Sequence, residues 1–262
     1  MRICWIHPTA KIPALHPLWD RLEREMQKVV RPGSNLEFRF LERSGNFTRS
    51  LYAEHLNSVL MVEAALKAEA DGFDGVFLAC WNDALWEARE VLAIPVGSVG
   101  EQSMLAALAM GKRFAVVTVS AKTAVAIEND LQAYGLRERA IVRPVRAIDP
   151  ESDGDLLLSA VTEPASRFIP QLEQTGRACI ADGAEIILTG CAYYGPLLRS
   201  AGYTHIPGTG VPVLDSTTVA LKYLEAMIDI AAITGVVKSE RLHFRTPPRE
   251  TLDRARAALD LF

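Results

Sequence analysis

Two cysteines stand at the ends of similar apolar runs. Cys80 ends the run 76–79, and Cys191 follows the run 186–190. Each run is short and apolar, which predicts a buried strand, and each is followed by residues that can begin a helix. A thiol placed between a strand and a helix lies near free backbone N–H groups, which favour the thiolate and lower its pKa. The matched settings predict a paired site.

Two such thiols can transfer protons to opposite faces of one carbon. One thiolate removes the proton from a carbon next to a carbonyl group, and the other thiol returns a proton to the opposite face. Positioned acid and base groups typically contribute roughly 10²–10⁴-fold to the rate. The backbone amides can hold the developing enolate oxygen. This chemistry requires no metal and no organic cofactor.

The elements that would position these thiols alternate along the chain. Apolar runs predict strands at 2–7, 36–41, 75–79, 94–96, 114–117, 141–145, 186–189 and 211–214. Helical spacing predicts helices at 17–30, 51–71, 83–92, 120–134 and 215–233. A long helix is expected to reach 182, with Pro164 and Pro170 starting, kinking or splitting it. Ser98 and Glu101 fit a capping box before an Ala-rich helix.

This alternation predicts an α/β fold with mainly parallel sheets and helices on both faces. Because the pattern of strand, cysteine and helix occurs twice, we expect two similar α/β halves that face each other. The first domain is expected to comprise 1–97 plus 211–262 and to carry Cys80, and the second, 98–210, to carry Cys191. Ligands of such sheets bind at the carboxyl ends of strands, where both thiols fall.

Composition limits the possible classes of protein. The chain has 262 residues, a net charge of -4 and 49% hydrophobic residues, as in an ordinary globular protein. The mild acidity does not favour binding to nucleic acid or to a membrane surface. There is no apolar run of the ~20 residues that span a bilayer, and the N-terminus lacks a signal peptide, so we expect a cytoplasmic protein. Four cysteines are too few for a disulfide scaffold.

The residues around the thiols carry a family resemblance. The segments 80–82, 116–118, 189–192 and 210–215 resemble those of the aspartate/glutamate/hydantoin racemase superfamily, and the hydantoin racemase-like branch most closely. The resemblance extends from the first strand to about Ile233. It implies a cofactor-independent racemase with Cys80 and Cys191 as the catalytic pair. It further implies pseudo-twofold related three-layer α/β/α domains with the site in the cleft between them, a small-molecule substrate and a homo-oligomer.

The resemblance also implies which residues bind the substrate. Hydroxyl and amide side chains near the first strand and beside the thiols have this role in the family, and Thr9, Asn82 and Thr118 match them by position. Thr118 is as readily a helix cap. The family pattern is not matched everywhere, since Trp81 precedes Asn82 and no Asn-rich turn follows the first strand. The neighbours of the thiols, which line the predicted pocket, are Trp81, Ala192 and Tyr193. Trp81 and Tyr193 suggest a hydantoin-like or amino-acid-like substrate larger or more apolar than aspartate.

The remaining candidates have simpler explanations. Cys4 and Cys179 lie inside a predicted strand and helix, where a free cysteine is normally a core residue. His7 is expected to be a packed residue at a strand end. Although Cys4 and His7 have the spacing of metal ligands, no second pair accompanies them, so no zinc site is expected. Glycine-rich nucleotide motifs are also missing from the sequence.

Other functions fit the same pattern. Within the superfamily, a maleate-type cis–trans isomerase and an arylmalonate-type decarboxylase are the alternatives, and the single catalytic thiol of the decarboxylases counts against them. From another class, a non-catalytic protein that closes around a small ligand would have the same two halves. Thiol reactivity separates these classes, because a catalytic pair includes a thiol that is alkylated fast at neutral pH.

Overall fold

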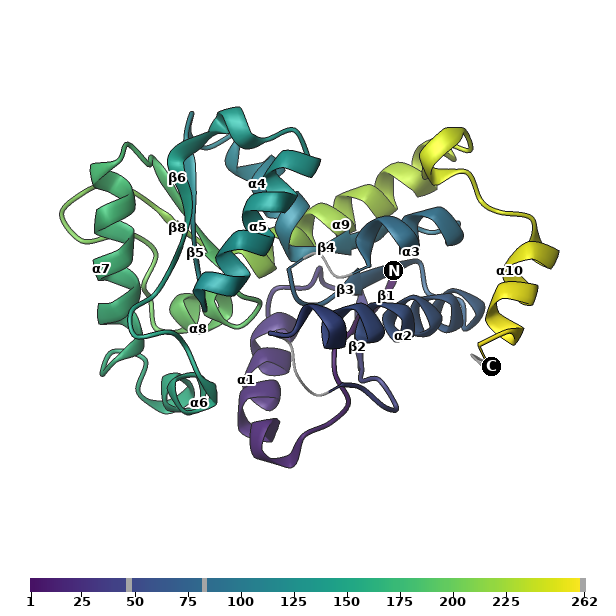
Figure 1. Cartoon of the computed structure of the whole chain (residues 1–262), viewed down its shortest axis with the longest axis horizontal. Coiled ribbons are helices and arrows are strands. Elements are labelled where there is room, and N and C mark those ends of the chain that lie inside the picture. Colours follow the sequence, from purple (N-terminus) through teal and green to yellow (C-terminus); the bar gives the residue numbers. More distant parts are fainter. Residues whose placement is uncertain (46–48, 82–83, 260–262) are drawn as a thin grey trace.

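The structure, a computed structural model, describes residues 1–45, 49–81 and 84–259. Within these residues the chain forms two four-stranded sheets, in the orders β2-β1-β3-β4 and β6-β5-β7-β8 (Figure 1). Neighbouring strands in both sheets are parallel. The same relative order therefore occurs twice along the chain. We call the first sheet and the second sheet, each with the helices packed on it, the first half and the second half.

The strands lie close to their predicted positions. The first sheet contains β1 (Arg2–Ile6), β2 (Asn35–Arg39), β3 (Gly75–Leu78) and β4 (Val96–Ser98). The second contains β5 (Phe114–Thr118), β6 (Ala140–Ala147), β7 (Ile186–Gly190) and β8 (Val213–Leu214). The α/β prediction with parallel sheets is confirmed.

The helices connect these strands. They are α1 (His16–Gln27), α2 (Leu51–Ala70), α3 (Leu85–Val91), α4 (Val99–Ala107), α5 (Ala121–Ala133), α6 (Gly154–Thr162), α7 (Phe168–Ala181), α8 (Tyr194–Ser200), α9 (Ser216–Thr234) and α10 (Arg249–Ala257). Short 3₁₀ turns lie at Pro13–Leu15, Arg137–Arg139 and Leu242–Phe244. None of the helices in the described part of the chain is both long and apolar enough to cross a membrane.

Side-chain caps explain where several helices begin. Ser50 and Ser120 accept from the backbone N–H three residues ahead at the starts of α2 and α5, and Asp215 does the same for α9. The capping box predicted at Ser98 is wrong. The Ser98 side chain makes no cap hydrogen bond, the Ser98 N–H donates to the side chain of Gln102 at 3.0 Å, and Glu101 forms an ion pair with Arg89.

The long helix predicted up to residue 182 is two helices. The first, α6, ends at Thr162, and α7 begins at Phe168. Pro164 lies in the break, as expected of a residue that has no backbone N–H and disfavours a helical residue before it.

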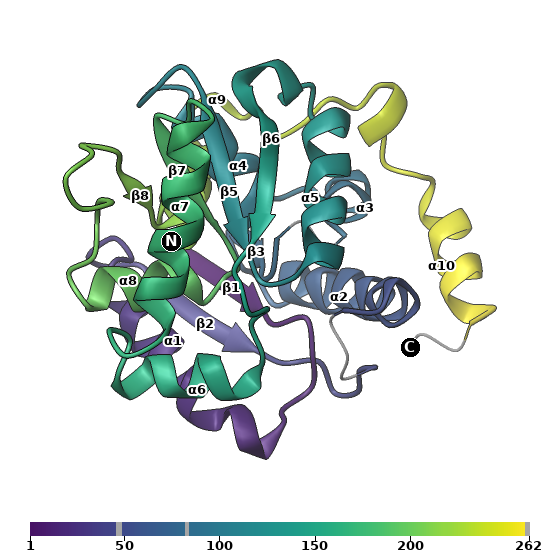
Figure 2. The ribbon, with the colours of Figure 1, turned by 60° about the vertical axis from the view of Figure 1, so that its left-hand side comes forward.

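Each sheet is covered by helices on both faces, which makes each half a three-layer α/β/α unit. In the first sheet, Trp5 and Phe77 stack at 4.5 Å on the face that α1 and α9 cover. Cys4 and Val76 point to the other face, which α2 and α3 cover. In the second sheet, α5 and α7 lie on opposite faces (Figure 2).

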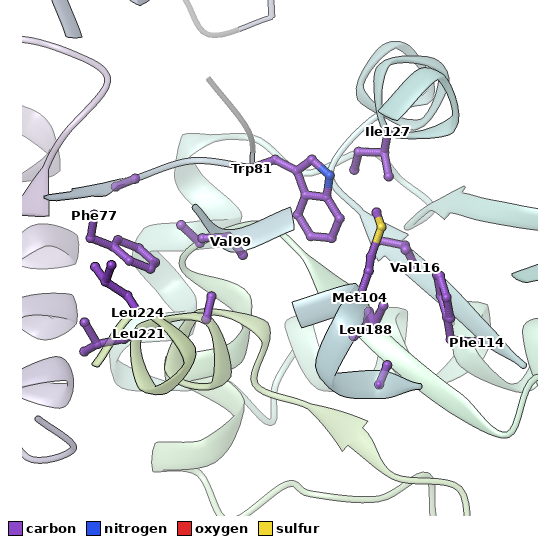
Figure 3. Close-up of a cluster of buried hydrophobic side chains, with 14 of the residues drawn as sticks. Phe77, Trp81, Val99, Met104, Phe114, Val116, Ile127, Leu188, Leu221 and Leu224 are labelled. Carbon is purple, nitrogen blue, oxygen red and sulfur yellow. The ribbon is translucent and has the colours of Figure 1, made fainter. Parts of the chain in front are cut away.

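The helices that follow the fourth strand of each sheet are exchanged between the halves. Helix α4 follows β4 of the first sheet but packs mainly against β7 of the second, and α9 follows β8 but packs mainly against β3 and β4, with further contacts to β7. The two helices also pack along each other. Their side chains join both sheets in one buried cluster, with Leu224 beside Phe77 at one end and Met104 beside Leu188 at the other (Figure 3).

The pairing of β8 corrects one part of the predicted division of the chain. The prediction assigned 211–262 to the first domain, but Val213 and Leu214 pair with Ile187 and Leu188 of the second sheet. The chain returns to the first half only with α9. Ser98, which the prediction placed in the second domain, pairs with Leu78 in the first sheet.

The C-terminal tail lies on the first half. Lys238 donates to the carbonyls of Arg89 (2.9 Å) and Glu90 at the end of α3. Arg256 of α10 forms an ion pair with Glu63 of α2 at 2.6 Å. The guanidinium bonds to both oxygens of the Glu63 carboxylate, and both side chains are largely shielded from solvent. The tail therefore rests on α2 and α3, away from the second sheet (Figures 1 and 2).

Candidate active site

The two thiols occupy equivalent places in the two halves. Both β3 and β7 are the third strand of their sheet, and Cys80 and Cys191 follow just after the carboxyl ends of these strands. Both residues are partly exposed, although protein atoms surround the Cys191 thiol itself. Cys4 and Cys179, by contrast, are fully buried, as predicted for core cysteines. Burial raises the pKa of Cys4 to about 12 and that of Cys179 to about 11.

Cys80 has an unusual backbone. Its φ of 121° lies in the region that residues with a side chain rarely adopt. Ala84, which precedes α3, also has a positive φ of 56°. A positive φ strains a residue that has a side chain, and strain of this kind is concentrated at functional sites. Asn82, the predicted substrate-binding neighbour, lies outside the described residues.

Cys191 is held by backbone amides. The N–H groups of Tyr193 and Tyr194, at the start of α8, bond to the thiol. These bonds and the nearby Arg49 lower its pKa, but burial is the larger effect and raises the pKa of Cys191 to about 11. The sequence predicts the amides correctly but the wrong direction for the pKa. Surrounding protein atoms remove solvent from the thiolate, and the amides only partly compensate for that loss.

Tyr193 is a common neighbour of the two thiols. Burial is the largest effect that raises the pKa of its phenol, and the charges of Cys191 and Cys80 both add to it. The phenol oxygen accepts a hydrogen bond from the indole N–H of Trp19 at 3.0 Å. Trp19 belongs to α1 of the first half, whereas Tyr193 belongs to the second. Tyr193 therefore lies where the halves meet, within electrostatic reach of both thiols.

The other predicted residues make backbone contacts. Thr118 is fully buried and donates its hydroxyl to the carbonyl of Gly190 at 2.7 Å, directly before Cys191. It does not cap α5, since Ser120 has that role. Ala192 is buried, and its carbonyl accepts from the Thr217 hydroxyl at 3.0 Å.

Thr9 is buried at the carboxyl end of the first sheet. Its carbonyl accepts from the N–H of Leu41 at 3.3 Å, which ties the loop after β1 to the loop after β2. Substrate binding by Thr9, Thr118 and Ala192 stays a prediction.

Trp81 points into the core between the halves. Its side chain is 5% exposed and lies near Val99 and Ile127 (Figure 3). The ring also covers Gly100, where an added Cβ would lie 2.6 Å from the indole nitrogen. A side chain at this position of α4 would therefore displace the ring. The structure places Trp81 in a packing role, and its contact with a substrate stays a prediction.

His7 lies beside the strand end that carries Cys80. Ala79 donates to the carbonyl of Ile6 at 2.9 Å, which brings the next residue of β1, His7, to the same edge. The imidazole is 1% exposed and stacks on Phe40 at 4.1 Å. Burial, with a smaller effect from Lys11, lowers the pKa of His7 to about 3. It is therefore a neutral, packed residue at physiological pH, as the sequence predicts.

Two residues near the thiols are not found by reading the sequence. Trp19 reaches Tyr193 from α1, and Arg49 lies near Cys191 although it belongs to the first half. Neither residue lies in a motif, and both are far from Cys191 in the sequence. Only the packing of the halves brings them there.

A metal site is not formed by the described residues. Nowhere in residues 1–45, 49–81 and 84–259 do three or more His, Cys, Asp or Glu side chains gather as metal ligands. The absence of a cofactor stays a prediction.

Comparison with known proteins places the chain in a family. Residues 18–224 match the model of the Asp/Glu/Hydantoin racemase family. The hydantoin racemase of Pseudomonas sp. (strain NS671) is 32% identical over 195 residues, which is 72% of each chain. The hydantoin racemase of Rhizobium meliloti is 33% identical over 183 residues, 68% of this chain and 70% of the relative.

The fold agrees with that assignment. The structure of allantoin racemase from Klebsiella pneumoniae superposes with a TM-score of 0.76 at 22% identity, over 95% of this chain and 94% of that one. With the family model covering most of the chain and two relatives above 30% identity, the predicted resemblance is confirmed. The chain belongs to the Asp/Glu/hydantoin racemase family, and it is an isomerase of the racemase type.

Proposed function

We propose that the protein is a cofactor-independent racemase in which Cys80 and Cys191 invert a carbon acid next to a carbonyl group. The observation that carries the proposal is the arrangement of the thiols. They follow the third strand of each sheet, and the phenol of Tyr193 is within electrostatic reach of both. We place the site in the cleft between the halves, at the carboxyl ends of β3 and β7.

The proposed reaction consists of two proton transfers. The thiolate of one cysteine takes the proton from the stereocentre, and the electron pair of the broken C–H bond moves into an enolate. The thiol of the other cysteine then donates its proton to the opposite face, which inverts the centre and leaves the second cysteine as the thiolate. No atoms are gained or lost overall. For the reverse reaction the two cysteines exchange roles, so each must act as both acid and base.

The substrate we propose is a hydantoin-like ring or, as the second choice, an amino acid. The curated relatives above 30% identity are both named hydantoin racemases. A hydantoin is uncharged at its stereocentre and carries a ring carbonyl next to it, so it needs hydrogen-bond donors more than a cation.

The test uses single enantiomers of 5-substituted hydantoins and of amino acids in D₂O. Wild type is expected to racemise its substrate and to introduce deuterium at the stereocentre. Cys80→Ser and Cys191→Ser are each expected to lose racemisation by at least about 10³-fold, because a serine hydroxyl is a poor acid and base near pH 7. Each variant should still exchange deuterium into one enantiomer only.

Cys179→Ala serves as the control, because this thiol is buried in α7 and has no part in the proposed reaction. Racemisation that survives the loss of either Cys80 or Cys191 would contradict the proposal. Isomerisation of an alkene or release of CO₂ without exchange at a stereocentre would point instead to the maleate-type or arylmalonate-type reaction.

We further propose that the enzyme works in the cytoplasm as a homo-oligomer and binds neither nucleic acid nor a membrane. The net charge of -4 supports the absence of nucleic-acid binding. Its oligomeric state is measured by light scattering after size-exclusion chromatography. For the division into domains we propose 1–98 plus 216–262 and 99–215, with α4 and α9 exchanged, since β8 pairs in the second sheet.

A further inference from the structure

The positively charged side chain of Arg49 extends from the first half to the second. It lies just before Ser50, the cap of α2, and its side chain is partly buried. The guanidinium donates a hydrogen bond to the carbonyl of Ser152, which precedes α6 in the second half. This hydrogen bond crosses from one half to the other next to the end of β5, the strand beside β7.

Ser152 leads directly to the loop of Cys191. It is fully buried, and its N–H donates to the carbonyl of Val119 at the end of β5 at 2.8 Å. Val119 follows Thr118, which pairs with Gly190, the residue directly before Cys191. The N–H of Tyr194 donates to the Cys191 carbonyl at 3.1 Å. Arg49 is thereby fixed next to the residues that surround Cys191.

The groups that act on Cys191 favour a role for this cation. The Cys191 thiol faces the amides and phenols of Tyr193 and Tyr194 from α8. It faces Arg49 from the loop before α2. Both phenols are held neutral, since burial raises their pKa values. Among these groups Arg49 supplies the positive charge. A thiolate removed from solvent by burial is stabilised by a nearby cation far more than an exposed one is.

We propose that Arg49 is the counterion of the Cys191 thiolate, so that the first half supplies the charge with which the thiol of the second half acts as a base. This inference rests on the proposed function of Cys191. It makes Arg49 a positioning and electrostatic residue rather than an acid or base. The rate of proton removal should therefore depend on Arg49 more for the enantiomer that Cys191 deprotonates than for the other enantiomer.

The test measures how fast Cys191 is alkylated by iodoacetamide between pH 7 and 11. The Cys80→Ser background isolates Cys191, and mass spectrometry of the peptides identifies the modified residue. Arg49→Met is expected to raise the apparent pKa of Cys191 by about one unit, which lowers its alkylation about tenfold at a fixed pH below that pKa. Arg49→Lys should restore most of the rate because it keeps the charge.

Two further variants separate charge from structure. Arg49→Gln keeps an N–H donor for the Ser152 carbonyl but has no charge, so it should behave like Arg49→Met, and it decides the question if Arg49→Met does not fold. Arg199→Met is the matched control. Arg199 also crosses between the halves, donating to the Glu25 carbonyl at 3.1 Å, but is not among the charges that act on Cys191.

The two possible failures give different results. An alkylation profile that is the same in wild type, Arg49→Gln and Arg49→Met would overturn the role of Arg49, even if Cys191→Ser is inactive. A profile that shifts equally in Arg199→Met would show that contact between the halves, rather than charge, sets the thiol pKa. Racemisation that survives in Cys191→Ser would contradict the proposed function itself, whatever the alkylation shows.

Discussion

The ends of β3 and β7 hold the two thiols at the same place in two sheets of the same strand order, but they surround them differently. Cys80 has a backbone φ of 121°, in the region that favours glycine. Cys191 has no positive φ and is bonded instead by the amides of Tyr193 and Tyr194. The backbone is strained at Cys80, whereas Cys191 is bonded by amides at the start of α8.

The neighbouring strands repeat this difference. Beside the end of β3, the first half places the buried imidazole of His7, stacked on Phe40. Beside the end of β7, the second half places Thr118, which holds the carbonyl of Gly190. Equivalent positions in the fold thus carry different chemistry. A symmetric reaction on a carbon acid does not require a symmetric site, because the two faces of the substrate differ.

The largest expected effect is the loss of stability in acid that His7 causes beside the end of β3. His7 has a pKa near 3 in the folded chain and about 6.5 when unfolded, so the unfolded chain binds the proton first. The stability from this group is complete above about pH 6.5 and is lost as the pH falls toward 3, by about 1.4 kcal/mol per pH unit. His7→Phe should flatten that part of the urea-unfolding profile. The exposed His55, changed to Phe, is the control, and an unchanged slope in His7→Phe would refute the assignment.

A second test concerns the packing before Cys191. In Gly190→Ala the added Cβ would lie 2.7 Å from Val116 and 2.8 Å from the Cβ of Thr118. Because both neighbours are buried in β5, we expect a loss of about 2 kcal/mol in the free energy of unfolding. Gly154→Ala is the control, since an added Cβ there meets nothing within 4 Å. Equal stability of the two variants in urea would show that β7 has room to move.

The smallest expected effect tests the strain directly. At position 80, Gly should be more stable than Ala by about 1 kcal/mol, because a positive φ penalises any Cβ. At position 191, Ala should be more stable than Gly by about 0.5–1 kcal/mol, because Gly loses more entropy on folding. Comparing Gly with Ala removes the effect of losing the thiol. A Gly-minus-Ala stability difference of the same sign at both positions would mean that the two loops do not differ in strain.

The fold follows from the sequence because its signals are local. Short apolar runs mark the strands, and Ser50, Ser120 and Asp215 mark the starts of helices. The sequence also places Cys80 and Cys191 at strand ends, since the residues that decide this lie within a few positions of each thiol. The prediction at Ser98 was wrong because Gln102 accepts from the Ser98 N–H and Arg89 pairs with Glu101.

What the sequence does not show depends on contacts across the two halves. The pKa of Cys191 rises because of burial, which a local pattern cannot measure. The ring of Trp81 packs on Gly100 of α4, a contact that no local pattern shows, and its contact with a substrate stays a prediction. Arg49 and Trp19 enter the site from other elements. The pairing of β8 was misjudged for the same reason, since its partner β7 is identified only by the fold.

The exchange of α4 and α9 limits how this enzyme can admit its substrate. Each helix fills part of the core of the half that its own strand does not belong to, and both share one apolar cluster (Figure 3). A wide hinge opening would pull these helices apart and expose that cluster to water, at roughly 25 cal/mol for each Å² of apolar surface. We therefore expect the halves to stay together during turnover. Entry and release of the substrate are then left to rearrangement of the chain segments that follow the strands.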